Sequence, residues 1–183
     1  MLLKSQELNL KKKDFFKGKI VLLYGENQDL IKDLNEQIFI KFKDEQKIQK
    51  NIFEEDVIEN PENTINYYLN GSLFDENKNI LVIKNCSDKI IETLNKIKNN
   101  IDENTIIINA EILLKNSKLR QFGEYDKVFI CIPCYQEAKF DIKKFLVQQI
   151  QINKLELSEN QIETILNFSS LKRSKIKAQK DEF

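Results

Sequence analysis

The turn at residues 24–30 is the stretch of this sequence best placed to hold a phosphate group. It follows a continuous apolar run, contains Gly25, and precedes a helical pattern that Asn27 can cap. In nucleotide-binding α/β proteins a strand, a Gly-containing turn and a helix follow one another, and backbone N–H groups at the start of the helix bind phosphate. The order of elements therefore favours a nucleotide-binding type of fold.

The residues needed for nucleotide chemistry are nevertheless missing. A loop of the G-x-x-x-x-G-K-[ST] type places a lysine on the phosphates and a hydroxyl on magnesium, whereas this turn carries Glu26 and Asp29, which would repel a triphosphate. Lys84 and Asn85 stand where an Asp-Glu pair would hold magnesium at the end of a strand. We therefore expect a fold that has lost its nucleotide, with no catalytic centre, cofactor or metal of its own.

A second candidate for chemistry is the C-x-x-C motif formed by Cys131 and Cys134. Such a pair, following a strand and opening a helix, can lower the pKa of one thiol and support thiol-disulfide exchange. Against this, Cys131 lies within the apolar run 128–132, where a buried thiol behaves as a small hydrophobic residue. A thiol-disulfide oxidoreductase therefore remains an alternative function.

A third candidate is a binding segment, Ser72-Leu73-Phe74, which places two large apolar residues in a turn directly before an apolar run. Taken alone, such a pair more often packs inward under a sheet than faces a partner. Both possibilities stay open on these residues alone: Leu73 and Phe74 belong to the core, or they anchor a partner protein.

The composition limits the other classes of function. The chain has no His, which removes the commonest general base and metal ligand. Lys+Arg and Asp+Glu both number 29, so no net charge attracts the chain to nucleic acid or to an anionic membrane. The N-terminus becomes charged too early for a signal peptide, and no apolar run approaches the roughly 20 residues of a membrane span. We expect a cytoplasmic protein without membrane contact.

Strand and helix patterns alternate through most of the chain. Continuous apolar runs, typical of strands buried on both faces, alternate with amphipathic helical patterns that begin at Asn27, Pro61, Ser87 and Ser117. The predicted strands are residues 18–25, 47–54, 80–84, 105–109 and 128–132. This alternation predicts an α/β protein with a parallel sheet, right-handed crossovers and helices on both faces.

From Phe140 onward only the helical period remains. One amphipathic helix is expected around residues 142–150, and a capping box between Ser158 and Gln161 opens another. The lysine-rich end, residues 171–183, has little apolar content, and we expect it to be frayed rather than packed. We therefore predict an α/β domain over residues 1–137, a small helical domain over residues 138–170 and a basic tail over residues 171–183.

Four dispersed motifs resemble the delta subunit of bacterial DNA polymerase III in their order and spacing. The resemblance is strongest to the alphaproteobacterial members of that family. The similarity covers about residues 18–168. The motifs are Leu22-Leu23-Tyr24-Gly25-Glu26-Asn27, Ser72-Leu73-Phe74 followed by Ile80-Leu81-Val82-Ile83-Lys84-Asn85, Asn116-Ser117-Lys118-Leu119-Arg120, and Ile132-Pro133-Cys134-Tyr135.

This resemblance implies an AAA+ type domain of the P-loop NTPase class with a degenerate nucleotide site, followed by the start of a helical lid. It implies that Ser72, Leu73 and Phe74 bind the sliding clamp (beta subunit), with the Leu-Phe pair in an apolar pocket of the clamp. The chain would be a non-catalytic accessory subunit of the DNA-directed DNA polymerase holoenzyme, a nucleotidyltransferase complex. Its other partners would be the gamma/tau and delta prime subunits, and primed DNA indirectly or weakly.

The resemblance is incomplete at the C-terminal end. The family continues through the rest of the lid into a helical collar domain that assembles the loader, whereas this sequence ends at Phe183 and residues 171–183 do not resemble the lid. We therefore expect a short or truncated form. A nucleotide-free P-loop-like module that binds an unrelated protein is the other alternative function.

Overall fold

The structure, a computed structural model of the 183-residue chain, describes residues 1–45, 49–70, 80–99, 101, 103–169 and 172–178. Its strands are β1 (Lys19–Tyr24), β2 (Gln49–Phe53), β3 (Ile80–Cys86), β4 (Thr105–Ala110) and β5 (Phe129–Pro133). Its α-helices are α1 (Gln28–Lys41), α2 (Glu54–Glu59), α3 (Pro61–Asn70), α4 (Ile91–Ile97), α5 (Lys118–Tyr125), α6 (Lys139–Ile152), α7 (Glu159–Phe168) and α8 (Arg173–Ala178). Short 3-10 helices are η1 (Ser5–Leu10), η2 (Lys13–Phe15), η3 (Lys43–Glu45) and η4 (Asp88–Ile90).

The five strands form one parallel sheet in the order β2-β3-β4-β1-β5. Every strand therefore ends at the same edge of the sheet, which we call the carboxyl edge. The predicted α/β class with a parallel sheet is confirmed. The order of the strands had to come from the structure, because the apolar runs are alike and carry no information on which of them are neighbours.

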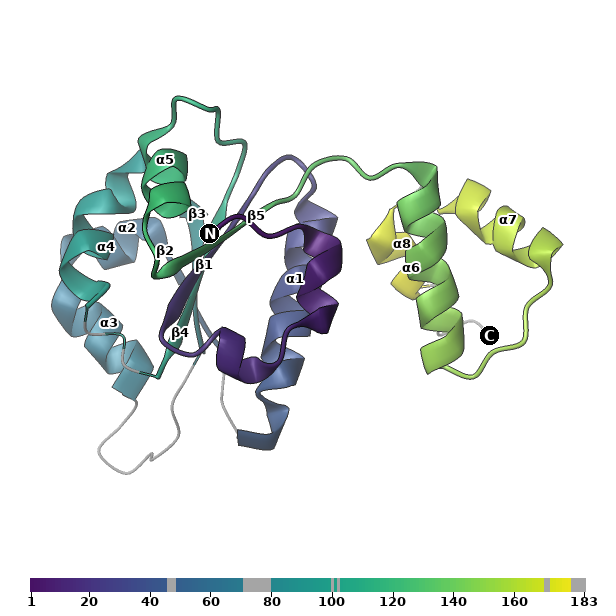
Figure 1. Ribbon diagram of the computed structural model, residues 1–183, viewed down its shortest axis with the longest axis horizontal. Helices are drawn as coiled ribbons and strands as arrows, with labels where there is room; N and C mark the ends of the chain where they lie inside the picture. The colour runs from purple at the N-terminus through teal and green to yellow at the C-terminus, as the bar shows by residue number, and fades with distance from the viewer. Residues whose placement is uncertain (46–48, 71–79, 100, 102, 170–171, 179–183) are drawn as a thin grey trace. The chain divides into compact units, whose positions relative to one another are not determined.

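Helices cover both faces of the sheet, as Figure 1 shows. On one face, residues of α2, α3, α4 and α5 pack against alternate strand residues, among them Ile20, Leu22, Ile106 and Ile108. On the other face, α1 and the N-terminal segment pack against the intervening residues, among them Val21, Leu23 and Ile107. Both sets are almost completely buried, which explains why the strands read as continuous apolar runs.

The N-terminal residues pair with the edge strand β5. The N–H of Leu3 donates to the carbonyl of Cys131 over 2.9 Å, and the N–H of Cys131 donates to the carbonyl of Met1 over 2.8 Å. Leu3, Leu8 and Phe16 are buried on the α1 face. The sequence pattern gave no sign of this pairing, because three residues are too few to show a period.

The predicted helix starts agree with the structure. Asn27 Oδ1 accepts from the N–H of Leu30 at 3.0 Å, and Ser87 Oγ accepts from the N–H of Lys89 at 3.3 Å. Ser158 and Gln161 form the expected capping box at the start of α7. These side chains satisfy N–H groups that the helix itself leaves without partners.

The chain divides into two compact units, residues 1–134 and 135–183. The second unit is built from α6, α7 and α8, which share a small core. That core contains Ile142, Phe145, Leu146, Ile162, Ile165, Leu166 and Ile176. Among the described residues of the whole chain, no helix is long and apolar enough to cross a membrane.

The expectation of a frayed, unpacked end was wrong for residues 173–178, which form α8. Ile176 is 4% exposed and joins the core of the second unit. The Arg173 guanidinium donates to the Glu137 carboxylate through Nε at 2.7 Å and Nη2 at 2.6 Å. One apolar residue and one distant ion pair fix this helix, and neither produces a periodic signal in the sequence.

Candidate functional site

The turn between β1 and α1 uses its backbone groups internally. The N–H of Gly25 donates to the carbonyl of Glu111 at 3.0 Å, and the N–H of Asn27 donates to the carbonyl of Cys134 at 3.0 Å. The N–H of Cys134 in turn donates to the carbonyl of Tyr24 at 2.7 Å. Two N–H groups of the turn, which in a phosphate-binding loop would face the ligand, are therefore bonded to the protein's own carbonyls.

Gly25 allows this closed arrangement. Its φ is +143°, and a Cβ atom built on it would lie 2.2 Å from the carbonyl oxygen of Cys134. Only glycine adopts this conformation without strain and leaves room for the backbone of Cys134. Two features of the turn therefore disfavour phosphate binding. One is the charge of Glu26 and Asp29, and the other is the direct packing of the turn against Cys134, the residue that follows β5.

A cavity of about 310 Å³ lies between α1 and the strands β2, β3 and β4. Most side chains that line it are polar, and six of them are amides: Gln28, Asn35, Gln49, Asn51, Asn85 and Asn109. Charged residues also contribute, with lysines and glutamates in equal number. Lys84 and Asn85, which occupy the place of a magnesium-binding pair in the sequence, both line this cavity.

Two amide oxygens in the cavity wall lack a hydrogen-bond donor. The Oδ1 atoms of Asn35 and Asn109 are buried, and neither has a partner among the described residues. The orientation of the Asn35 amide is fixed, because its Nδ2 donates to the carbonyl of Ile31 at 3.0 Å. A buried acceptor without a donor costs about 1–3 kcal/mol, and both oxygens are closed off from the space of the cavity, so an occupant of the cavity does not reach them.

The end of β3 bends sharply beside the cavity. The register between β3 and β4 shifts between Ile83 and Cys86, and Asn85 has φ +58°. Asparagine tolerates this left-handed conformation better than most residues. Unusual backbone conformations of this kind are concentrated at functional sites in proteins.

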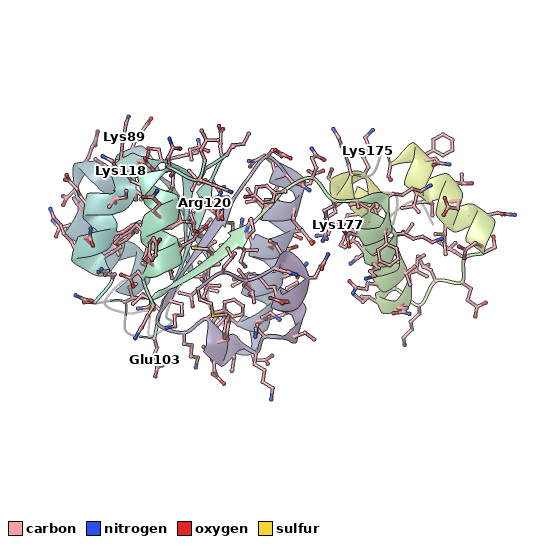
Figure 2. All side chains as sticks on the ribbon, turned by 45° about the horizontal axis from the view of Figure 1, so that its top comes forward. Lys89, Glu103, Lys118, Arg120, Lys175 and Lys177 are labelled. Carbon is pink, nitrogen blue, oxygen red and sulfur yellow. The ribbon has the colours of Figure 1, made fainter. Side chains whose placement is uncertain are left out.

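Side-chain hydrogen bonds fix the loop between β4 and α5, which also lies at the carboxyl edge. Arg120, labelled in Figure 2, donates to the carbonyl of Leu113 at 3.3 Å and to Glu124 at 2.8 Å. Asp88 accepts from Ser117 Oγ at 2.8 Å and from the N–H groups of residues 118 and 119 at 3.1 and 2.9 Å. These bonds hold the pKa of Asp88 below its ordinary value. The loop between β4 and α5 is therefore held by side-chain bonds to η4 and within its own segment.

The predicted clamp-binding residues Ser72, Leu73 and Phe74 lie outside the described residues. The elements on either side are described: α3 ends at Asn70 and β3 begins at Ile80. The start of β3 is at the edge of the sheet opposite the carboxyl edge, because β3 runs parallel to its neighbours. The assignment of these three residues stays a prediction.

The two cysteines of the C-x-x-C motif lie on opposite faces of the sheet. Cys131 packs in the core beneath α2 to α5, whereas Cys134 packs in the core beneath α1. Both side chains are fully buried and neither is in a disulfide. Burial raises the pKa of the Cys131 thiol to about 12. This placement does not support thiol-disulfide exchange, because the thiolate is the reactive form and needs access to its substrate.

We predict that the thiols resist alkylation in the native protein. Cys86 is also buried, and burial raises the pKa of its thiol as well. At pH 8 iodoacetamide should modify the three cysteines only as fast as the protein unfolds, and all of them rapidly in denaturant. Mass spectrometry of the time course measures this. Fast modification of Cys131 or Cys134 alone in the folded protein would restore the oxidoreductase alternative.

Comparison with known proteins gives matches of structure and none of sequence. No protein-family model and no curated protein sequence matches the chain. A clamp loader delta protein of Bacillus subtilis matches with a TM-score of 0.60 and 13% identity, over 93% of this chain and 53% of that one. AMPPCP-bound DnaA of Aquifex aeolicus matches with a TM-score of 0.54 and 12% identity, over 97% and 57%. A Rhizobiales Trip13 matches with a TM-score of 0.51 and 13% identity, over 85% and 59%.

The chain has an AAA+ type fold. The likeness to the clamp loader delta protein and to DnaA carries this conclusion, together with the five-stranded parallel sheet. At 12–13% identity the comparisons establish the fold alone. The chain spans between half and three fifths of the length of these proteins.

Sequence reasoning missed three residues of the carboxyl edge: Asn35, Asn109 and Cys134 in its backbone role. Asn35 sits within an amphipathic helix, where one asparagine reads as a solvated residue, and yet it is 8% exposed. Asn109 is the last residue of the predicted strand 105–109, whereas β4 continues to Ala110. The missed signal was the set of amides that end neighbouring strands, at the edge where parallel sheets bind ligands.

Proposed function

We propose that this protein is a clamp-loader subunit of the delta type, which binds the sliding clamp and helps to open its ring for loading onto DNA. The observation that carries the proposal is an AAA+ type fold whose β1–α1 turn is bonded internally. The N–H groups of Gly25 and Asn27 donate to the carbonyls of Glu111 and Cys134. In such a fold the turn that binds a nucleotide in other proteins makes hydrogen bonds within the protein itself. The outer surface of the domain stays available for contacts with other proteins. This arrangement suits an accessory protein that acts through contacts, with ATP hydrolysis in neighbouring subunits.

The clamp-binding segment is proposed to be Ser72-Leu73-Phe74, by the sequence resemblance described above. In the sequence the segment falls between α3, which ends at Asn70, and β3, which begins at Ile80. Anchors of this kind contribute mainly through burial of apolar surface, about 1.5–3 kcal/mol for each large side chain. Two such side chains would supply much of the affinity of a transient complex.

The further partners are proposals of the same kind: the gamma/tau and delta prime subunits of the loader, with primed DNA reached through them. The second unit, residues 135–183, would correspond to the start of the lid. The protein would then be a non-catalytic part of the DNA polymerase III holoenzyme in the cytoplasm. The buried cysteines on opposite faces leave the oxidoreductase alternative without support.

The decisive experiment measures binding of the full chain to the sliding clamp of the same organism by surface plasmon resonance. The variant Leu73→Ala/Phe74→Ala should bind at least about 100-fold more weakly, since it loses roughly 3 kcal/mol or more of apolar burial. The matched control is Ile112→Ala/Leu114→Ala. It removes an aliphatic pair that is 60% and 66% exposed at the carboxyl edge, and it should retain wild-type affinity.

Two results would contradict the proposal. Wild-type chain that does not bind the clamp would favour a nucleotide-free interaction module for another protein. Unchanged affinity of the Leu73→Ala/Phe74→Ala variant would remove the assigned segment. A titration with ATP and magnesium accompanies these measurements, and we expect no saturable binding, because the turn amides of Gly25 and Asn27 are already bonded.

A further inference from the structure

The loop between β4 and α5, residues 111–117, presents two large aliphatic side chains to solvent. Ile112 is 60% exposed and Leu114 is 66% exposed. Leu113, between them, is partly buried and packs against the core beneath α2 to α5. In Figure 1 the loop projects beyond the start of α5. The anchored Leu113 therefore holds its two neighbours on the outside of the loop.

Hydrogen bonds hold this loop in one conformation. Three consecutive carbonyls, those of residues 113, 114 and 115, each accept a hydrogen bond. The donors are Arg120 Nη1 at 3.3 Å, the N–H of Ser117 at 2.9 Å and Gln121 Nε2 at 3.1 Å, in that order. A surface that is already ordered loses less conformational entropy when a partner binds. The two exposed aliphatic side chains are therefore displayed on a backbone that needs no further ordering.

Three lysines lie in the same region: Lys115 in the loop itself, Lys118 at the start of α5 and Lys89 on η4. Asp88 joins η4 to the loop, because it accepts from Ser117 Oγ at 2.8 Å and from the N–H of Lys118 at 3.1 Å. Figure 2 labels Lys89 and Lys118 at the same end of the first unit. Within the described part of the chain, none of the three lysines forms an ion pair. Their positive charges are therefore open to a partner.

The combination of aliphatic side chains and lysines selects the class of partner. Exposed apolar surface favours a partner that contributes apolar side chains of its own, and exposed cations favour carboxylates. Nucleic acid would use the lysines and leave Ile112 and Leu114 uncovered. Residues 111–118 also contain no aromatic ring on which a base could stack. A protein segment with both aliphatic and acidic side chains uses the whole surface.

We propose that the surface formed by Ile112, Leu114, Lys89, Lys115 and Lys118 docks a short segment of another protein that carries both aliphatic and acidic residues. The aliphatic side chains of the partner cover the exposed pair, and its carboxylates pair with the lysines. Electrostatic attraction speeds the encounter, and the apolar contact supplies most of the affinity. This docking surface does not depend on the proposed clamp-binding function.

The test uses the full chain and a phage-displayed library of random short peptides as the probe. Selection at low salt should enrich peptides that combine aliphatic with acidic residues. The best of them, made synthetically, should bind in the micromolar range by fluorescence anisotropy. Replacing its acidic residues with the corresponding amides should weaken binding at least about tenfold. If no peptide is enriched, or if the enriched peptides lack acidic residues, the proposal is wrong.

Variants in the aliphatic pair identify the surface. Ile112→Ala/Leu114→Ala should weaken binding of the selected peptide at least about tenfold, since both anchors lose most of their apolar surface. The control Leu10→Ala/Ile152→Ala removes aliphatic side chains that are 81% and 72% exposed on other elements, and it should bind the peptide normally. Clamp binding should be unchanged in Ile112→Ala/Leu114→Ala, so failure of this proposal and failure of the clamp-binding proposal are separate results.

Variants in the lysines test the charge. Lys115→Gln/Lys118→Gln should weaken peptide binding at least about tenfold at low salt and reduce its salt dependence. The control Lys43→Gln/Lys96→Gln removes two exposed lysines of other elements and should bind almost normally. A single-stranded oligothymidine serves as the competing probe. Peptide binding that survives both the aliphatic and the lysine variants, or oligothymidine that binds more tightly than the peptide and displaces it, would overturn the assignment.

Discussion

Replacing Gly25 with alanine is expected to destabilise the first unit by roughly 3–5 kcal/mol. The alanine Cβ would be placed 2.2 Å from the backbone oxygen of Cys134, at φ +143°. Strain of the backbone costs about 1–3 kcal/mol and overpacking about the same again. Because the atom that obstructs the Cβ is in the backbone, no rotamer change relieves the contact. Urea unfolding of the full chain, followed by circular dichroism, measures the loss.

Hydrogen exchange shows where the structure opens. The N–H groups of Asn27 and Cys134 bond across the contact that alanine disrupts, so their exchange should accelerate more than that of the β1 core. Gly18→Ala is the control. Gly18 has φ +64°, where alanine costs about 1–2 kcal/mol, and it is not part of this turn. Protection of Cys134 that is unchanged in Gly25→Ala, with a loss no larger than in Gly18→Ala, would contradict the proposed internal role of the turn.

The elements of the fold were predictable because local chemistry defines them. Continuous apolar runs mark strands buried on both faces, and Asn27, Ser87 and Ser158 mark helix starts by accepting N–H bonds. The loss of nucleotide binding stays a prediction, based on the charges of Glu26 and Asp29 at the place where phosphate would bind. These features depend on residues within a few positions of one another.

The closed turn, the cavity and α8 were not predictable, because each depends on residues far apart in the sequence. Gly25 packs against Cys134, although Cys134 is the last residue of the first unit and lies far from Gly25 in the sequence. Asn35 becomes a buried acceptor only because α1 lies on the sheet beside Asn109. Leu73 and Phe74, which the sequence resemblance predicts to bind the clamp, lie outside the described residues. Long-range contacts of this kind leave no periodic pattern in the sequence.

Removing Arg173 is expected to unfold much of the second unit. Arg173 pairs with Glu137 in a two-point hydrogen-bonded ion pair, and the two side chains are only 10% and 9% exposed. The guanidinium also lies 4.2 Å from the centroid of the Phe145 ring. Arg173→Met leaves the Glu137 carboxylate buried without its partner, which costs about 3–5 kcal/mol. Since α8 is a six-residue helix, too short to persist alone, it should lose its structure.

Hydrogen exchange of the full chain measures this loss separately in the two units, and only α6 to α8 should lose protection in Arg173→Met. The control is Lys139→Met, which removes an ion pair with Glu163 whose side chains are 53% and 39% exposed; exposed pairs contribute at most about 1 kcal/mol. In Glu137→Met/Arg173→Met both charges are gone, so much of the stability should return. If the double variant were as unstable as Arg173→Met, the loss would come from packing on Phe145 rather than from the unpaired carboxylate. If Arg173→Met behaved like Lys139→Met, the pair would not hold α8 in place.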